Sequence, residues 1–371
     1  MKNTFGSSIT VTVFGESHGE AIGVVIDGIA PGIVIKEEKI KSALSKRRPH
    51  GTISTARTEE DPFTLLSGVY EGKTTGTPLT AVIQNQNTRS SDYAALRDTP
   101  RPSHADFTAE AKYHGYQDPR GGGHFSGRVT AGLVLAGAIL SSALEDAFGI
   151  RIGTHILSVK GVCDRKMTGS AEEISALNAR PFPTLTEDAG ERMRAVIEEA
   201  RQRGDSVGGV LESTIVGVPV GIGEPFFDSV ESVLSRLLFS VGGVKGVEFG
   251  SGFDITHLCG SQANDAFVIK DGKIKTETNH SGGIQGGITN GMPILVRTAV
   301  KPTPSIFKEQ DTVSLSLGQN TTITLTGRHD PCIVHRAAAV VDAMLAIGIA
   351  DLIAMRYGTD ALKEGIACNT D

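Results

Sequence analysis

Cysteine is scarce in this chain, and its spacing suggests neither a zinc site nor a disulfide framework. The 371 residues contain four cysteines, which lie far apart and form no CxxC pair: Cys163, Cys259, Cys332 and Cys368. Zinc motifs and disulfide-rich domains bring their cysteines together at short or regular spacings. We therefore expect reduced thiols in a cytoplasmic protein.

A strong charge bias and long hydrophobic runs are also lacking. The formal net charge of -6 argues against general nucleic-acid binding, which depends on many uncompensated lysines and arginines. The most apolar segment, residues 131–143, is shorter than the roughly 18 residues of a membrane span. The N-terminus has no apolar signal-peptide core. We expect no nucleic-acid or membrane partner, so any anionic ligand must be held by local arginines.

Common nucleotide and metal motifs are missing too. The segment GVYEGKT (68–74) resembles a phosphate loop, but three residues rather than four separate its glycines, and a strand is predicted after it. No glycine cluster reproduces GxGxxG between a strand and a helix. The histidines His18, His104 and His329 show no HxxxH or HxH spacing and have arginine neighbours, which repel a cation. We expect neither a nicotinamide-type fold nor a bound metal.

Glycine, by contrast, is abundant, with 45 residues, and one stretch combines it with arginine and histidine. Residues 101–128, RPSHADFTAEAKYHGYQDPRGGGHFSGR, place these cationic and imidazole side chains around Gly121–Gly123. Glycine can adopt φ > 0 and turn backbone N–H groups toward a ligand. A predicted helix follows from residue 130, with the positive end of its dipole facing this turn. The stretch is either an anion site or a tight loop with solvated arginines. Similar residues at 14–19 (FGESHG) and 327–332 (GRHDPC) favour the site.

Hydrophobic periodicity and turn residues predict the order of elements. The expected strands are 9–13, 24–29, 63–69, 78–84, 150–161 and 206–218. The expected helices are 36–46, 130–144, 187–203 and 334–355, with a further helix after residue 228 that Asp228 could cap. The sequence from 244 to 305 is rich in predicted loops. Because strands often adjoin strands, we predict an α+β fold of antiparallel sheets covered by helices, with residues 1–371 as a single domain.

Eight segments resemble the chorismate synthase family. They are FGESHG (14–19), RRP (47–49), RPSHADFT (101–108), RGGG (120–123), VKGVEFGSGF (244–253), NHSGGIQGGITNG (279–291), KPTPSI (301–306) and GRHDPC (327–332). They occur in the family order and span essentially the whole chain. The resemblance implies a homotetramer with a β-α-β sandwich core and internal pseudosymmetry. It also implies reduced FMN as cofactor and a 1,4-anti elimination that converts 5-enolpyruvylshikimate 3-phosphate to chorismate in the shikimate pathway.

Matching these motifs residue by residue implies roles for particular side chains. His18 would be the acid at the departing phosphate, and His104 would protonate or stabilise the reduced flavin, assisted by Ser17, Ser126 and Asp330. The cofactor contacts would be His124, Phe125, Ser126, Gly242, Gly243, Gly286, Lys301, Pro302, Thr303, Pro304, Ser305 and Arg328. The substrate clamps would be Arg47, Arg48, Arg128 and Arg328.

One segment departs from the family pattern. The family commonly reads GGGRSSAR where this chain has GGGHFSGR, so His124 and Phe125 replace an arginine and a serine. Either His124 supplies the missing positive charge or Phe125 stacks on the flavin. No added reductase domain is indicated, so a separate flavin reductase or an anaerobic environment would supply the reduced cofactor, and direct use of NADPH stays open. The competing classes are a flavin-dependent oxidoreductase on a phosphorylated anion and a non-catalytic anion-binding protein.

Overall fold

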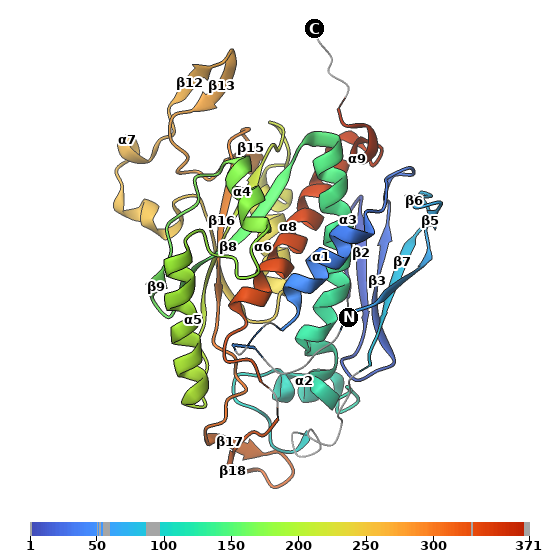
Figure 1. Ribbon diagram of the computed structural model, residues 1–371, viewed down its shortest axis with the longest axis vertical. Helices are drawn as coiled ribbons and strands as arrows, with labels where there is room; N and C mark the ends of the chain where they lie inside the picture. Colours follow the sequence, from blue (N-terminus) through green and yellow to red (C-terminus); the bar gives the residue numbers. More distant parts are fainter. Residues whose placement is uncertain are drawn as a thin grey trace.

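Two antiparallel five-stranded sheets enclose a layer of helices in the computed structural model, which describes residues 2–49, 51, 53–54, 60–86, 97–327 and 329–366 (Figure 1). The first sheet has the order β1 (Thr4–Phe5), β2 (Thr10–Gly15), β3 (Ala21–Asp27), β7 (Leu79–Gln84) and β4 (Phe63–Ser67). The second has the order β11 (Val244–Phe249), β16 (Ile294–Val300), β10 (Gly209–Val216), β8 (Arg151–Val159) and β9 (Val162–Cys163). The predicted α+β sandwich of antiparallel sheets and helices is confirmed.

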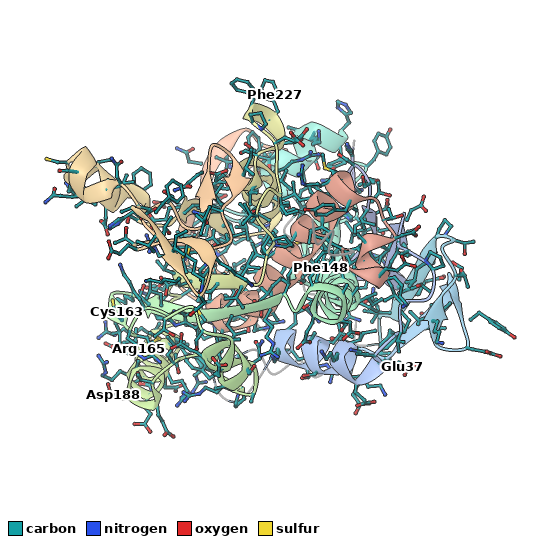
Figure 2. All side chains as sticks on the ribbon, turned by 90° about the horizontal axis from the view of Figure 1, so that it is seen from above. Glu37, Phe148, Cys163, Arg165, Asp188 and Phe227 are labelled. Atoms are coloured by element: carbon teal, nitrogen blue, oxygen red, sulfur yellow. The ribbon has the colours of Figure 1, made fainter. Side chains whose placement is uncertain are left out.

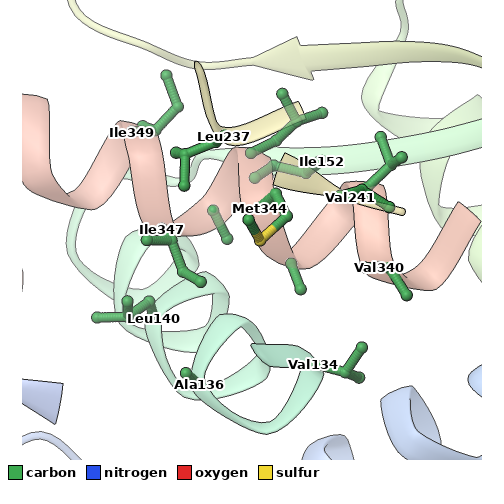
Figure 3. Close-up of a cluster of buried hydrophobic side chains, with 14 of the residues drawn as sticks. Val134, Ala136, Leu140, Ile152, Leu237, Val241, Val340, Met344, Ile347 and Ile349 are labelled. Carbon is green, nitrogen blue, oxygen red and sulfur yellow. The ribbon is translucent and has the colours of Figure 1, made fainter. Parts of the chain in front are cut away.

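Helices α3 (Thr130–Phe148) and α8 (Val334–Tyr357) form the centre of the layer between the sheets. Figure 3 shows Val134 and Leu140 of α3 near Met344 of α8, with Ile152 of β8 on the second-sheet side. These side chains belong to a single buried cluster that extends into both sheets. The two helix backbones approach closely at Gly137, where an added Cβ would lie 2.4 Å from the Cα of Ala343.

The apolar character of these two helices follows from their position. The segments Gly127–Phe148 and Val334–Tyr357 are long and apolar enough to cross a membrane, but 72% and 89% of their most apolar windows are buried inside the protein. A helix between two sheets is covered on opposite sides and can therefore be apolar all round. Helix α3 continues four residues beyond its predicted end at residue 144, to Phe148. Its C-cap is Gly149, which adopts the left-handed conformation that favours glycine.

Shorter elements surround this core. The further helices are α1 (Glu37–Arg47), α2 (Asp106–Tyr113), α4 (Ala171–Asn178), α5 (Glu187–Gln202), α6 (Val230–Ser240), α7 (Gly260–Ala263) and α9 (Ala361–Glu364). The small hairpins are β5 (Val69–Tyr70) with β6 (Lys73–Thr74), β12 (Phe267–Lys270) with β13 (Lys273–Thr276), β14 (Ile284–Gln285) with β15 (Ile288–Thr289), and β17 (Gln310–Ser314) with β18 (Gln319–Ile323). Figure 2 shows Glu37 of α1 and Asp188 of α5 at the periphery, so the charged faces of both helices meet solvent.

Two local predictions were wrong. The segment 244–253 was expected to be loop, but β11 pairs with β16, which the sequence analysis did not predict. Glycines interrupt the strand signal of β11, and its register shifts between Val244 and Gly246. Pairing with β16 therefore stabilises this segment as a strand. The N-cap of α6 is Ser229, whose Oγ accepts from the N–H of Ser232 at 3.1 Å. Asp228 instead ends a preceding 3-10 turn.

Asp342 of α8 carries a carboxyl group whose ionisation should make the stability of the protein depend on pH. Its carboxylate accepts a hydrogen bond from Thr154 Oγ1 at 2.6 Å. Burial raises the pKa of Asp342 from 3.8 to about 6, although the Thr154 bond and the charge of Lys46 oppose the rise. Between these two pKa values the unfolded chain loses a proton that the folded chain keeps. The free energy of unfolding therefore falls as pH rises from 3.8 to about 6, and the loss of stability persists at higher pH.

We expect Asp342→Asn to raise the melting temperature at neutral pH, because the amide cannot ionise. Below the unfolded pKa both forms of wild type hold a neutral carboxyl group, so the gain should be small there. Thermal melts at the two pH values measure the difference. An equal change in melting temperature at both pH values would contradict the assigned burial of the charge.

Candidate active site

Three consecutive glycines lie beside two of the three histidines that the sequence singled out. The FGESHG segment forms the turn between β2 and β3, and the N–H of Ser17 donates to the carbonyl of the third glycine at 3.1 Å. Gly121–Gly123 have φ values of 61°, 82° and 53°. A Cβ on the first glycine would lie 2.5 Å from the ring of His18, and one on the second 3.6 Å from that of His104. The positive φ values favour glycine at all three positions, and the close approach of His18 excludes a side chain at the first.

His104 is held by a carboxylate that an arginine also grips. Its Nδ1 lies 2.6 Å from Asp106 Oδ1, and Arg101 donates to both oxygens of that carboxylate, each at 2.8 Å. Burial opposes ionisation of Asp106, but the hydrogen bonds from Arg101 and His104 outweigh it and hold its pKa well below the usual range. An ionised acceptor favours the tautomer with the proton on Nδ1. The Nε2 atom of His104 is then left to exchange a proton with a ligand.

Three of the predicted clamp residues converge on Asp61, which sequence reasoning missed. Arg47 Nη2 lies 3.0 Å from its carboxylate and Arg48 Nε 3.5 Å, and Arg128 also donates to it. Burial alone would raise the pKa of Asp61, but the charges of Arg47 and Arg128 lower it below its usual value. Burial lowers the pKa of Arg47 to about 10. Among the described residues three guanidinium groups share this carboxylate, a charge balance that suits an anionic ligand.

A cavity of about 820 Å³ lies beside these groups. Helices α3 and α8 supply an apolar wall that includes Leu133, Val340 and Met344. The predicted cofactor residues that line the cavity are His124, Phe125, Ser126, Gly242, Gly243, Lys301, Pro302, Thr303 and Pro304. Of the predicted acid–base and clamp residues, His104, Asp330 and Arg47 also line it. The structure therefore brings chain segments from residue 47 to residue 330 to one hollow.

Some predicted residues lie away from this cavity. Ser305 lies behind its wall, where its Oγ is 3.3 Å from Arg101 Nη1. Gly286 lies in the β14–β15 turn and does not line the cavity. Ser17 and His18 lie beside Gly121 of the glycine turn, and Arg48 and Arg128 lie beside Asp61. Arg328 lies outside the described residues.

The two residues that depart from the family pattern are held in place by contacts with different parts of the chain. His124 Nδ1 lies 2.9 Å from the carbonyl oxygen of Gly15, which can only accept, so this nitrogen carries a proton. The ring of Phe125 packs edge-on against Tyr113 of α2, with centroids 6.0 Å apart. Both side chains line the cavity. His124 is thus anchored to the end of β2, while Phe125 presents an aromatic surface that α2 supports.

The structure adds site residues that the motifs did not indicate. The N-terminal segment Lys2–Phe5 forms part of the cavity wall, and the Arg236 guanidinium lies 5.3 Å from the ring centre of Phe5. Arg236 is an exposed residue of α6 beside the buried Leu237, and nothing in the sequence distinguished it from other helix-surface arginines. Arg336, in the first turn of α8, pairs with Asp330 and donates to the carbonyl of Arg47 at 2.8 Å.

His329, the third histidine of the sequence analysis, takes a different position. Its ring packs against Phe307 with centroids 5.6 Å apart, and Nε2 lies 3.3 Å from the carbonyl of Thr326. Burial lowers its pKa, as do the charges of Arg101 and His104, against the opposing bond to Thr326. It does not line the cavity. His18 and His104 are therefore the two of these three histidines that lie beside the glycine turn.

Fold and site together define an α+β enzyme that handles anions, with imidazoles beside buried arginines at the mouth of a largely apolar cavity. The family model described as chorismate synthase matches residues 9–354. The chain is 46% identical over 353 residues to a chorismate synthase of Thermococcus gammatolerans, covering 95% of this chain and 97% of that relative. A chorismate synthase of Opitutus terrae is 46% identical over 355 residues, with coverages of 95% and 96%.

A solved structure described as a crystal structure of chorismate synthase is similar with a TM-score of 0.74 and 28% identity, covering 96% of this chain and 94% of that one. The chain belongs to the chorismate synthase family. Its function is that of this family, a carbon–oxygen lyase of chorismate biosynthesis in the shikimate pathway.

Proposed function

We propose that the chain releases phosphate from 5-enolpyruvylshikimate 3-phosphate by a 1,4-anti elimination that depends on reduced FMN. The observation that carries this proposal is the glycine turn, where His18 lies beside Gly121 and His104 beside Gly122, next to a basic cluster and a cavity. The substrate has two carboxylates and a phosphate. The arginines around Asp61 provide the positive excess that such a ligand requires.

The cavity residues fit FMN in size and chemistry. Small-molecule sites usually measure about 300–1,000 Å³ and are mostly apolar with a few placed polar groups. The wall from α3 and α8 suits a flat ring, and Lys301 and Arg236 could hold a phosphate. We assign cofactor contacts to His124, Phe125, Ser126, Gly242, Gly243, Gly286, Lys301, Pro302, Thr303, Pro304, Ser305 and Arg328. When bound, reduced FMN supplies the electron density that assists loss of phosphate.

We assign the proton steps to side chains around the glycine turn. His18 gives a proton to the departing phosphate, and His104 exchanges one with the cofactor through Nε2, in the tautomer that Asp106 favours. The Oγ of Ser17 is buried and has no hydrogen-bond partner within the described residues, so it is available to a ligand. Ser126 and Asp330 line the cavity and assist these proton transfers.

We further propose that a separate flavin reductase supplies the cofactor and that the chain acts in the cytoplasm as a single domain within a homotetramer. The absence of a GxGxxG segment supports a separate reductase. Exposed apolar side chains on the projecting β12–β13 hairpin support assembly: Phe267, Ile269 and Ile274 are each about two-thirds exposed or more. The cysteine usage supports the cytoplasm.

The decisive experiment is anaerobic incubation with reduced FMN and 5-enolpyruvylshikimate 3-phosphate, following phosphate release and flavin absorbance together. We expect many equivalents of phosphate per FMN with no net oxidation of the flavin. Stoichiometric oxidation of FMN with product formation would instead identify an oxidoreductase. Binding without phosphate release would identify a passive anion binder. The family relationship favours neither of these alternatives.

Arg48→Ala is expected to weaken substrate binding by roughly 1.5–3 kcal/mol, the contribution of a hydrogen bond to a charged group. Its Nε is buried without a hydrogen-bond partner among the described residues, and its 3.5 Å approach to Asp61 is the longest of the three. Arg328→Ala should behave alike. Calorimetric titration measures the affinity, with Arg192→Ala on the exposed face of α5 as the control. Unchanged affinity in both variants would remove these arginines from the site.

A further inference from the structure

A second cavity of about 330 Å³ lies on another side of the helix layer. It is bordered by α1, α3 and α8, which Figure 1 shows next to one another, together with β8 and α4. None of its described lining residues also lines the candidate active site. Its volume is at the lower end of the roughly 300–1,000 Å³ typical of small-molecule sites. The cavity is therefore a separate candidate site for a small ligand.

Asp342 presents a carboxylate to this cavity that is only partly satisfied. One oxygen accepts from Thr154 Oγ1 at 2.6 Å, and that hydroxyl lies 2.7 Å from Ser213 Oγ. Within the described part of the chain, the other oxygen has no hydrogen bond and no cation forms an ion pair with Asp342. Burial disfavours the charged form, as the raised pKa of about 6 reflects. A cationic group of a ligand would satisfy this carboxylate.

Lys46 of α1 presents the complementary charge. It is half-buried, lines the same cavity and makes no ion pair with a described residue. The other two cations of the lining are already paired: Lys39 binds Glu145, and Arg151 lies 3.5 Å from the same carboxylate. With respect to the described residues, the cavity thus contains one ammonium group and one carboxylate without an ion-pair partner, and the two form no ion pair with each other. A ligand that carries both charges on a short frame would bridge them.

The wall between these charges is apolar and built from small or branched side chains. It includes Val134, Ala138, Ile150, Ile174 and Ala339. Such a surface gains free energy when an apolar group displaces water from it. A ligand with an apolar side chain beside its two charges would therefore fit the cavity better than a purely polar zwitterion.

We propose that this cavity binds an apolar α-amino acid, with its ammonium group on Asp342, its carboxylate on Lys46 and its side chain against the apolar wall. Lys46 directly precedes Arg47 of the candidate active site, so the two sites share helix α1. The proposal concerns binding alone and does not depend on the reaction that the first site catalyses.

Calorimetric titration of the full chain with L-phenylalanine and L-leucine tests the proposal. Phenethylamine lacks the carboxylate and N-acetyl-L-phenylalanine lacks the ammonium group, so each should bind at least about tenfold more weakly than L-phenylalanine, as expected for one lost charge-assisted contact. Glycine, without a side chain, should also bind more weakly. The proposal would be overturned if neither L-phenylalanine nor L-leucine bound, or if phenethylamine or N-acetyl-L-phenylalanine bound as tightly as L-phenylalanine.

Two substitutions test whether the ligand binds in this cavity. Asp342→Asn and Lys46→Gln should each weaken L-phenylalanine binding at least about tenfold. Asp146→Asn is the control, because Asp146 of α3 pairs with Lys36 and does not line the cavity. This variant should bind L-phenylalanine with the affinity of the wild type. Lys46→Gln, on a half-buried side chain, tests the same cavity independently from the side of the other charge. Full affinity in a folded variant of either residue would refute the assignment.

Discussion

His104→Ala and His18→Ala are each expected to lower turnover by roughly 10²–10⁴-fold while the protein stays folded, because a positioned proton donor contributes about that much. The ring of His18 lies beside Gly121 and that of His104 beside Gly122, so the two imidazoles occupy different positions and neither can replace the other. Initial rates of phosphate release under anaerobic conditions measure the loss, and thermal melts control for folding. Two variants with near-normal turnover that melt much earlier would show that the histidines are structural.

The two histidines should differ in their secondary effects. Loss of His18 should be most harmful above neutral pH, where solvent is a poor substitute for an acid at the departing phosphate. Loss of His104 should change the absorbance spectrum of bound reduced FMN, recorded with an unreactive substrate analogue. Asp106→Asn should reproduce part of the His104 effect, because an amide no longer favours the tautomer that leaves Nε2 available. An unchanged absorbance spectrum in both variants would show that His104 does not act on the cofactor.

Asp61→Ala is expected to destabilise the protein by about 3–5 kcal/mol, because it leaves buried guanidinium groups without their counter-ion. Arg47 and Arg128 have side chains 5% and 3% exposed, so water cannot take over from the lost carboxylate. Urea unfolding followed by circular dichroism measures the change. Asp188→Ala is the matched control, because its ion pair with Arg192 is exposed, and it should change stability by less than about 0.5 kcal/mol.

Inorganic phosphate should restore part of the stability of Asp61→Ala, because it can occupy the vacated arginines. The low pKa of Asp61 also predicts that wild type loses this contribution as pH falls below 3.8 and through the still lower folded pKa, whereas the variant lacks it throughout. A loss of stability no larger than that of Asp188→Ala, or no response to phosphate, would contradict the proposed cation cluster.

Local sequence predicted most of the regular elements, because side-chain periodicity reports which face of a helix or strand is buried. The strands around FGESHG, the helix ending in Arg47 and the long C-terminal helix lie within a few residues of their expected positions. Prediction was weakest where glycine interrupts the pattern. In β11, pairing with β16 rather than propensity maintains the strand, and no local signal reports a partner about fifty residues away.

The candidate site divides in the same way. Residue types and motif resemblance indicated the histidines, the arginines and the glycine turn, because each is a local chemical signal. Asp61 and Arg236 carried no such signal, since an aspartate before a strand and an arginine within a helix are ordinary in sequence. Their roles arise from contacts between distant segments, such as Asp61 with Arg128. The second cavity is likewise a product of packing, because Lys46 and Asp342 face one hollow only after α1 and α8 have come together.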